Sequence, residues 1–299
     1  MTNLPKVSVQ EIVDRVDTLP ELPQVAMRVS QMMEDPNVSA DKIGEVIKLD
    51  AGMTSQILKL CNSAAYGLKR QVSTVKEAVA ILGFKTLKSM VYTIIGKIAL
   101  DRPVTGYSLE QGDLWYNSLT CAVYAKHIAK KEKFADPELA FTAGLLRDIG
   151  KIVLGEYVGA NYGQIEQLAL QEQLDFHEAE ERLLGFSHSS VGQRVAEKWK
   201  LPEPIIKVIR YHHKPIAFPE GLNPSERTLI TIVHLADVFT MMIGRGMGAD
   251  GMMYSLDLEA LSVAGIDVSE NQLEILLGEL LEMNAVVKSL VDSFGTAGQ

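Results

Sequence analysis

The sequence has few cysteines, no excess of basic residues and little alternation of polar and apolar residues. Its 299 residues include two cysteines, Cys61 and Cys121, which lie in apolar helical patterns without the spacing of metal ligands or of a disulfide framework. We therefore expect two buried free thiols. The formal net charge of −9 and the pI near 5.3 argue against a nucleic-acid-binding surface, because phosphate contacts require concentrated lysine and arginine.

Neither a secretion signal nor a membrane span is expected from the sequence. The segment Met1–Lys6 lacks the basic start and the apolar stretch of a secretory signal. The longest apolar run, from about Leu229 to Gly244, contains His234 and Asp237 and is too short to cross a bilayer. The expected location is the cytoplasm, and neither membranes nor nucleic acids are expected partners.

Apolar residues recur with helical spacing through nearly all of the chain, so the predicted fold is all-α. Ser39 is placed to cap a helix that runs to Leu49, and Thr74 with Glu77 forms a predicted capping box for a helix that ends near Leu82. Further helices are expected over residues 8–18, 24–34, 54–64, 85–100, 111–131, 138–154, 161–174, 176–185, 188–199, 203–213 and 225–244.

The domain organisation is predicted from one connecting segment. Residues 101–108 contain a proline and a glycine and are typical of a connection between helical bodies. We therefore expect a small N-terminal helical subdomain over 1–105 and a second helical subdomain over 106–245. Residues 246–299 are expected to form a flexible Gly-rich loop followed by C-terminal helices.

The C-terminal region contains two patterns with alternative interpretations. Gly246, Gly248 and Gly251 have the spacing of a dinucleotide-binding motif, but no strand precedes them, which favours a flexible loop. A closing helix from Ser269 to about Asp292, with a capping box of Ser269 and Gln272, is predicted to carry one apolar stripe: Leu273, Leu276, Leu280, Val287, Leu290 and Val291. Packing onto the chain itself is the favoured interpretation, and a homodimer or partner interface is the alternative.

The segment Gly144–Lys151, GLLRDIGK, places Arg147, Asp148 and Lys151 in an otherwise apolar helical run. Burying such charges costs several kcal/mol unless they are paired or bind a metal, so partners are expected elsewhere. The candidates are imidazoles and a carboxylate, which suit divalent Fe, Mn or Zn: His188, His212, His213 and Asp237. Taken singly, these residues have simpler interpretations as a helix cap, a surface histidine and a partner of a neighbouring helix end.

The order of the segments LWYNSL, GLLRDIGK, SHSSVG, YHH and LAD resembles the metal-dependent HD phosphohydrolase superfamily, whose pattern is His, His-Asp, His, His-His, Asp. The segments NSAAYG and AVAILGF narrow the resemblance to the HD-related output domain (HDOD) family, over about residues 10–240. This resemblance implies an HD-like helical subdomain and a role in bacterial signal transduction. Receiver or cyclic-dinucleotide modules often accompany such domains.

Two positions depart from the enzyme pattern that the resemblance supplies. Asn117 stands where the enzymes have their first His, and Arg147 stands where the His of the His-Asp pair is expected. The matching positions are Asp148, Lys151, His188, His212, His213 and Asp237. Asn is a weak ligand and the Arg guanidinium stays protonated, so we expect neither catalytic residues nor a cofactor.

We predict that Arg147 takes the place of the ion and forms bidentate hydrogen bonds with Asp148 or Asp237, with Lys151 joining the network. The alternative is that Arg147 points to solvent and leaves a vestigial pocket. Any residual divalent metal, Fe, Mn or Zn, would be bound by a subset of five residues: Asp148, His188, His212, His213 and Asp237.

These expectations favour a non-catalytic regulatory module that acts through contacts with other signalling proteins. One alternative is a phosphohydrolase of nucleotides or cyclic dinucleotides with an unusual metal site. The two missing ligands argue against it, as does the absence of a GYP tripeptide near YHHKP. The other alternative is a sensor that binds a nucleotide without turnover, with Arg147, Lys151 and His212 contacting a phosphate.

Overall fold

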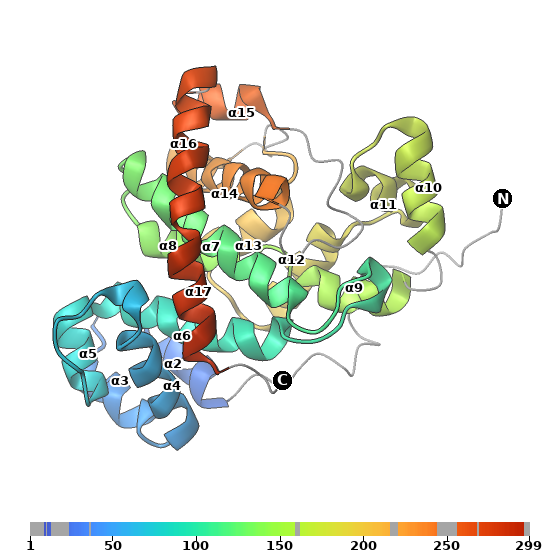
Figure 1. The fold of residues 1–299 in the computed structure, drawn as a ribbon. Helices are drawn as coiled ribbons and strands as arrows, with labels where there is room; N and C mark the ends of the chain where they lie inside the picture. Colours follow the sequence, from blue (N-terminus) through green and yellow to red (C-terminus); the bar gives the residue numbers. More distant parts are fainter. Residues whose placement is uncertain are drawn as a thin grey trace. The chain divides into compact units, whose positions relative to one another are not determined.

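The computed structural model describes residues 9, 11–12, 24–35, 37–158, 162–215, 221–243, 256–267 and 269–295 (Figure 1). In these ranges the chain is helical, and the only extended pairing is an isolated antiparallel bridge between Val104 and Leu109. The predicted all-α fold is therefore confirmed. No helix among the described residues is both long and apolar enough to cross a membrane. The predicted Gly-rich loop around 246–251 lies outside the described residues.

The chain divides into two compact units. Unit 1 comprises Met1–Leu19 and Ala99–Leu277, and unit 2 comprises Pro20–Ile98 and Gly278–Gln299. One boundary falls inside α6 (Phe84–Leu100) and another falls inside α16 (Glu270–Glu282). The C-terminal residues, which the sequence suggested as a third region, are thus shared between the two units.

Unit 2 contains short, well-capped helices. They are α2 (Gln24–Met32), α3 (Ala40–Ile47), α4 (Ala51–Cys61), the short 3₁₀ helix η1 (Ala64–Tyr66), α5 (Val75–Leu82), most of α6, and α17 (Asn284–Ser293). The Ser39 hydroxyl accepts the Lys42 N–H at 3.3 Å, as predicted. The Thr74 hydroxyl accepts the Glu77 N–H at 3.1 Å, but the Glu77 carboxylate accepts from Ser73, so the reciprocal half of the capping box is displaced by one residue.

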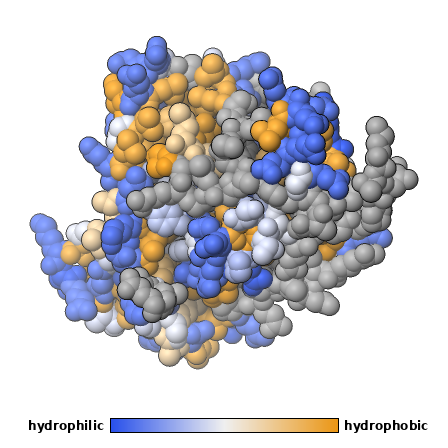
Figure 2. Space-filling view, turned by 45° about the vertical axis from the view of Figure 1, so that its right-hand side comes forward, coloured by the Kyte–Doolittle hydropathy of each residue, from blue (hydrophilic) through white to orange (hydrophobic). Residues whose placement is uncertain are grey.

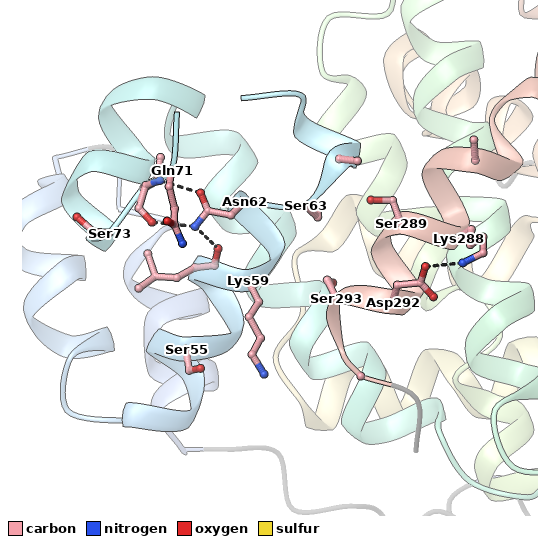
Figure 3. A pocket seen from close by; sticks show the side chains of 15 residues that line it. Ser55, Lys59, Asn62, Ser63, Gln71, Ser73, Lys288, Ser289, Asp292 and Ser293 are labelled. Atoms are coloured by element: carbon pink, nitrogen blue, oxygen red, sulfur yellow. Dashed lines mark hydrogen bonds and ion pairs between the residues drawn. The ribbon is translucent and has the colours of Figure 1, made fainter. Parts of the chain in front are cut away.

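Unit 2 also contains an open pocket of about 1090 Å³ (Figure 3). Its walls come from α4, from residues 62–64 and 71–73 and from α17. The Ser289 hydroxyl of α17 accepts the Ala65 N–H at 3.1 Å, which ties α17 to η1. The Asn62 side chain bonds the backbone of Val72 through both its oxygen and its nitrogen. Asn62 and Ser289 therefore hold the pocket walls together.

Unit 1 is built around long buried helices (Figure 1). Its elements are η2 (Thr105–Tyr107), α7 (Asp113–Lys131), α8 (Pro137–Leu146), α9 (Gly150–Val158), α10 (Tyr162–Glu172), α11 (Phe176–Leu184), α12 (His188–Lys198), α13 (Glu203–Tyr211), α14 (Pro224–Ile243), α15 (Leu258–Val263) and most of α16. Helix α7 packs against α8 and α14, whereas α12 packs against α9 and α13. This arrangement brings α7, α8, α12, α13 and α14 around one buried centre.

The expected single helix over 138–154 is wrong, because the chain turns between α8 and α9. At this turn Ile149 N–H bonds the Leu146 carbonyl and Lys151 N–H bonds the Asp148 carbonyl, a tighter pattern than an α-helix. Gly150 explains why the turn packs closely, since a Cβ there would lie 1.8 Å from the His188 carbonyl oxygen. The sequence pattern does not indicate this turn, because the residues before and after the turn are equally apolar and buried.

The expected single C-terminal helix is also divided, at Met283, into α16 and α17. The Met283 N–H is shared between the carbonyls of Glu279 and Leu280, which tightens the chain at this point. Most of the predicted stripe is nevertheless buried: Leu276, Leu280, Val287 and Leu290.

Exposed apolar residues remain on the C-terminal helices. Leu258 and Val263 of α15 and Ile275 of α16 are among the large exposed hydrophobic residues. On the face drawn in Figure 2, hydrophobic and hydrophilic residues are interspersed. Pairing of two chains through the C-terminal helix stays a prediction. Both cysteines are buried free thiols, as expected.

Candidate functional site

The buried centre of unit 1 contains a cluster of charged side chains. Arg147 and Asp148 are each 1% exposed, Asp237 is 3% exposed and Lys151 is 4% exposed. Arg147 and Asp148 lie in the turn between α8 and α9, while Asp237 lies in the middle of α14. Such charges remain ionised in a protein interior only where opposite charges and hydrogen bonds surround them.

Close helix packing brings these residues together. A Cβ at Gly144 would lie 3.1 Å from the Cys121 carbonyl oxygen, so this glycine lets α8 approach α7. Gly150 does the same for α9 and α12. The two glycines of the GLLRDIGK segment therefore allow the Arg147–Asp148 turn to pack closely against α7, which carries Asn117, and α12, which carries His188.

One part of the cluster, which we call the arginine side, comprises Asn117, Arg147, Asp237 and the Oδ2 atom of Asp148. Arg147 Nε donates to Asp237 Oδ1 at 2.7 Å, and Nη2 lies 2.6 Å from the same oxygen. Nη2 also donates to Asn117 Oδ1 at 2.5 Å and lies 3.2 Å from Asp148 Oδ2. Nη1 donates to the Gly144 carbonyl at 3.1 Å. Every nitrogen of the guanidinium thus has an acceptor.

The charge of Arg147 is permanent in this setting. Burial by itself lowers the pKa of the guanidinium, but Asp237 and Asp148 raise it above its ordinary value. The prediction that Arg147 takes the place of an ion beside Asp148 and Asp237 agrees with this geometry. Both contacts of Arg147 to Asp237 go to one carboxylate oxygen, however, and not to two as a bidentate pair would. The solvent-facing alternative for Arg147 is wrong, since the side chain is 0% exposed.

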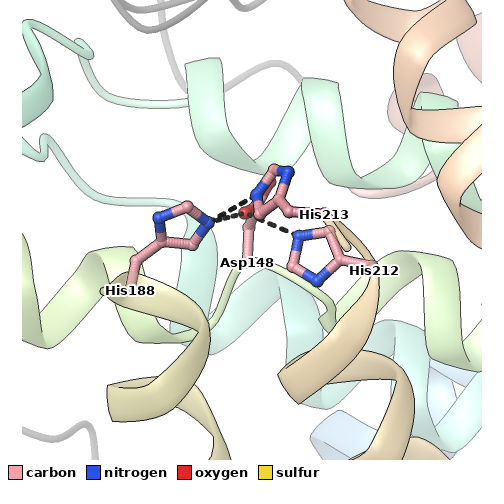
Figure 4. Close-up of side chains that lie close together, drawn as sticks. All are labelled: Asp148, His188, His212 and His213. Carbon is pink, nitrogen blue, oxygen red and sulfur yellow. Dashed lines mark hydrogen bonds and ion pairs between the residues drawn. The ribbon is translucent and has the colours of Figure 1, made fainter. Parts of the chain in front are cut away.

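The other part of the cluster, the histidine side, comprises Asp148 Oδ1 with His188, His212 and His213 (Figure 4). Each residue offers one ligand atom, and the four atoms lie within 4.8 Å of one another. His188 Nε2 is 2.8 Å from His213 Nε2 and 3.4 Å from Asp148 Oδ1. His212 Nε2 is 3.7 Å from Asp148 Oδ1.

Glu180 of α11 supports the histidine side from behind. It is fully buried, and its Oε2 atom accepts from the His188 backbone N–H at 2.8 Å and lies 2.7 Å from His188 Nδ1. The Tyr107 hydroxyl donates to the other oxygen of Glu180. Burial by itself lowers the pKa of His188, but Glu180 raises it, and the net shift is upward. Glu180 therefore holds a proton on Nδ1 and turns Nε2 toward the cluster.

Two polar atoms of the histidine side have no hydrogen-bond partner. These are Asp148 Oδ1 and His212 Nε2, which face one another at a distance too long for a hydrogen bond. Asp148 Oδ1 has only longer ionic contacts, such as the one to Lys151 Nζ at 3.3 Å. Lys151 and Arg147 outweigh the effect of burial and hold the pKa of Asp148 well below its ordinary value. The donor set, three imidazoles and a carboxylate with unsatisfied atoms, fits a divalent transition-metal ion.

A model of the HDOD domain family matches residues 19–215, which is more than half of the chain. The chain belongs to the HDOD family. A sequence relative from Treponema pallidum (strain Nichols), named as an uncharacterized protein, is 26% identical over 231 residues. The alignment covers 76% of this chain and 43% of the relative, so the chain spans less than half of that protein's length.

Solved structures share the HDOD fold. An HDOD domain protein of unknown function from Geobacter sulfurreducens is 28% identical with a TM-score of 0.74, covering 95% of this chain and 96% of that one. A Shewanella amazonensis SB2B protein, named as a candidate phosphohydrolase, is 22% identical with a TM-score of 0.73, covering 97% and 99%. A candidate signal transduction protein from Marinobacter aquaeolei VT8 is 20% identical with a TM-score of 0.71, covering 96% and 65%.

All eight residues singled out in the sequence meet in this HDOD protein. Five lie on or beside the arginine side and three complete the histidine side: Asn117, Arg147, Asp148, Lys151 and Asp237, then His188, His212 and His213. Lys151 also lies 5.7 Å from the centre of the Tyr107 ring. The helical positions of His188 and Asp237 were expected, whereas His212 follows the last residue of α13 as its C-cap.

Three buried polar residues around the histidine side were not among the predicted site residues. They are Glu180, His177 and His234. His177 Nε2 lies 2.8 Å from the Ser189 hydroxyl, and His234 Nδ1 lies 2.8 Å from the His212 carbonyl. Glu180 and His177 stand among the charged residues of α11, whose composition is typical of a solvated face. The one available signal was the position of His234 in the apolar run of α14.

Proposed function

We propose that this chain is a regulatory HDOD module that acts through contacts with other proteins and does not hydrolyse phosphate esters. The observation that carries the proposal is Arg147, which lies between Asn117, Asp148 and Asp237 in the position where the resembling enzymes bind an ion. A catalytic metal lowers the pKa of a bound water and polarises the substrate. A guanidinium with all of its nitrogens paired offers neither service.

The names of structural neighbours are compatible with a regulatory role. The Marinobacter aquaeolei VT8 protein is named as a candidate signal transduction protein. At 20% identity this similarity supports the fold of the chain. The name of that protein is the reason to test this chain for binding to other proteins. The identity of the partner is left to binding experiments with the full protein.

The test of this proposal compares wild type with the double variant Asn117→His, Arg147→His. We expect no turnover of a generic phosphodiester by wild type with added Mn²⁺. The double variant restores the two missing ligands, so it should bind more metal than wild type. Wild-type turnover that is abolished by His188→Ala would contradict the proposal.

The second candidate is a metal-dependent phosphohydrolase that uses the histidine side. The unpaired Asp148 Oδ1 and His212 Nε2 atoms favour it, because a bound cation would satisfy both. Two Shewanella amazonensis SB2B neighbours are named as candidate phosphohydrolases. The same hydrolysis assay separates the two candidates, since only this one requires turnover by wild type.

A further inference from the structure

We propose that the open pocket of unit 2 is a docking groove for a short extended segment of a partner protein, in which an acidic residue stands next to an apolar one. The pocket, which we call the α4–α17 groove, is lined mainly by α4, by residues 62–64 and 71–73, and by α17 (Figure 3). All of these residues belong to unit 2. The inference rests on the proposed regulatory function and assigns a surface to it.

The size and openness of the α4–α17 groove favour a segment of a protein over a small ligand. Small-molecule sites have volumes of about 300–1,000 Å³ and bury most of the surface of the ligand. The groove, at about 1090 Å³, is slightly larger and is open to solvent. Most of the residues that line it are exposed, among them Ser55, Lys59 and Ala285. A peptide segment that runs through the groove can bury some of its side chains while both of its ends continue in solvent.

One cation of the α4–α17 groove has no partner. Lys288 Nζ lies 2.6 Å from Asp292 Oδ2 on α17, so these two charges offset each other. The Lys59 ammonium forms no hydrogen bond or ion pair with the residues that the structure describes. Figure 3 shows the Lys59 side chain extending from α4 into the space between α4 and α17. A carboxylate of the partner segment would complement this charge.

The hydroxyl groups of the α4–α17 groove offer both acceptors and donors to a peptide backbone. Ser63 and Ser293 each donate to the carbonyl three residues earlier, at 2.7 and 2.6 Å, so their oxygens remain as acceptors. Ser289 Oγ accepts the Ala65 N–H at 3.1 Å, so its proton is available to a carbonyl. An extended segment presents N–H and C=O groups that need partners, whereas a helix satisfies most of its own. The mixed hydroxyls therefore favour an extended segment.

An inorganic anion such as phosphate fits the α4–α17 groove less well than a peptide. Phosphate oxygens accept hydrogen bonds and require several donors or cations around them. Ser63 and Ser293 have already committed their protons, and the Asp292 carboxylate adds negative charge to the α17 wall. Among the described residues that line the groove, Lys59 is the one unpaired cation.

Part of the groove lining is apolar. Leu58, Val72, Ala64 and Ala285 contribute to it. Leu58 is partly exposed, so an apolar side chain of the partner segment would remove more of its surface from water. The Asn62 side chain holds the backbone of Val72 through contacts of 2.7 and 2.8 Å. This lining is therefore ordered before a partner binds, which lowers the entropic cost of binding.

The test uses the full chain and a library of random octapeptides displayed on phage. Peptides are selected on wild type, and the enriched sequences are synthesised with a fluorescent label and titrated with the protein. We expect the enriched sequences to share an Asp or Glu next to an apolar residue. Their binding should weaken as the ionic strength rises, because salt screens a charge pair at the rim of an interface.

Two variants examine the groove. Lys59→Glu should weaken binding of an enriched peptide by at least about tenfold, because like charges would then face each other. A peptide in which the acidic residue is replaced by lysine should recover binding to Lys59→Glu. Ala285→Trp, at an exposed position on α17, adds a bulky side chain to the groove and should block the peptide whatever its charge.

The matched control is Lys42→Glu, which changes the net charge equally at an exposed position on α3 outside the groove. It should bind the peptide as wild type does. Circular dichroism and melting temperature are measured for each variant, and the comparison is made between variants that are folded like wild type.

Four outcomes would overturn the inference. They are the enrichment of no peptide, an affinity that Lys59→Glu leaves unchanged, displacement of the peptide by millimolar inorganic phosphate at constant ionic strength, and self-association of wild type that Ala285→Trp abolishes. The third would assign the groove to an anion and the fourth to a second copy of this chain. Phosphodiester hydrolysis is measured in the same wild-type sample. Hydrolysis would overturn the proposed regulatory role, whereas failure to bind a peptide without hydrolysis would overturn this inference alone.

Discussion

The two oxygens of Asp148 face surroundings that differ in how their polar atoms are satisfied. On the arginine side, Oδ2 meets a guanidinium whose nitrogens all have acceptors, including Asp237 and Asn117. On the histidine side, Oδ1 and His212 Nε2 have no hydrogen-bond partner. The chain itself satisfies the polar atoms of the arginine side. The histidine side has two unpaired polar atoms that a bound ligand could satisfy.

The difference shows how one carboxylate can serve two kinds of cation. Arg147 is covalently attached and cannot dissociate or exchange, so the arginine side contributes its pairing under all conditions in which the protein is folded. An ion on the histidine side would be exchangeable, and its contribution would depend on the free metal concentration. The arginine side is thus expected to dominate stability, and the histidine side to dominate responses to ligands and pH.

The largest expected change in stability comes from removing the guanidinium of the arginine side. Arg147→Met leaves Asp237 and one oxygen of Asp148 buried without their main cation. The free energy of unfolding should fall by about 3–5 kcal/mol, the usual cost of removing one partner from a buried ion pair. Urea denaturation measures this change.

A matched control is Arg194→Met on α12, whose ion pair with Glu197 is exposed. It should cost at most about 1 kcal/mol. Adding Asp237→Asn to Arg147→Met should recover part of the loss, because the orphaned charge is removed with its partner. Equal decreases in unfolding free energy for Arg147→Met and Arg194→Met would show that the arginine side contributes no more to stability than an exposed ion pair.

The next largest change in stability is expected from replacing Glu180, whose carboxylate contacts His188 of the histidine side. Glu180→Gln removes the negative charge that His188 Nδ1 faces and leaves the shape of the side chain nearly unchanged. The expected cost in metal-free protein is about 1.5–3 kcal/mol of unfolding free energy, the range for a hydrogen bond to a charged group. Tyr107→Phe removes a hydroxyl that donates to the other oxygen of the same carboxylate and leaves both contacts of His188 to Glu180 in place, so it should cost less, about 1.5 kcal/mol, the low end of that range. A larger loss for Tyr107→Phe would contradict the role given to Glu180.

Much of the fold was predictable because helix signals are local. The caps at Ser39 and Thr74 and the long helices α7 and α14 follow from short patterns of polar and apolar residues. The turn at Ile149 was not predictable in this way. Its residues are buried like those of the helices beside it, and the close approach of Gly150 to α12 is a tertiary contact that no local pattern indicates.

The candidate site was predictable where a residue broke an apolar pattern. Arg147 and Asp237 stand out as charges in buried helical runs. Glu180 does not stand out, because α11 is rich in charged residues and the tertiary packing alone decides which of them is buried. His234 was noticed only as a polar residue in an apolar run, and its bond to the His212 carbonyl depends on the packing of α13 against α14.

His234 offers a smaller way to disturb the histidine side. Its Nδ1 atom lies 2.8 Å from the His212 carbonyl, and its Nε2 atom accepts the Asp257 N–H at 3.0 Å. His234→Leu leaves both groups without this partner and should lower the unfolding free energy by about 1–2 kcal/mol. Met242→Ala, an exposed position on the same helix, should change it by less than about 0.5 kcal/mol. Amide hydrogen exchange at Asp257 should quicken only in the His234 variant.

The smallest expected effect is a pH dependence of stability that comes from His177, which lies beside the histidine side. Burial lowers the pKa of His177 to about 2, and His188 and His212 add to the shift. His177 therefore stays neutral in the folded protein, while in the unfolded chain it takes up a proton below a pKa near 6.5. The stability it contributes is present above pH 6.5 and is lost as the pH falls toward 2, which amounts to about 1 kcal/mol between pH 7 and 5.5. His177→Gln keeps a partner for Ser189 and should reduce this loss, measured by urea denaturation at both pH values, whereas His127→Gln serves as the control. A pH dependence of stability unchanged by His177→Gln would show that other groups of the cluster titrate in its place.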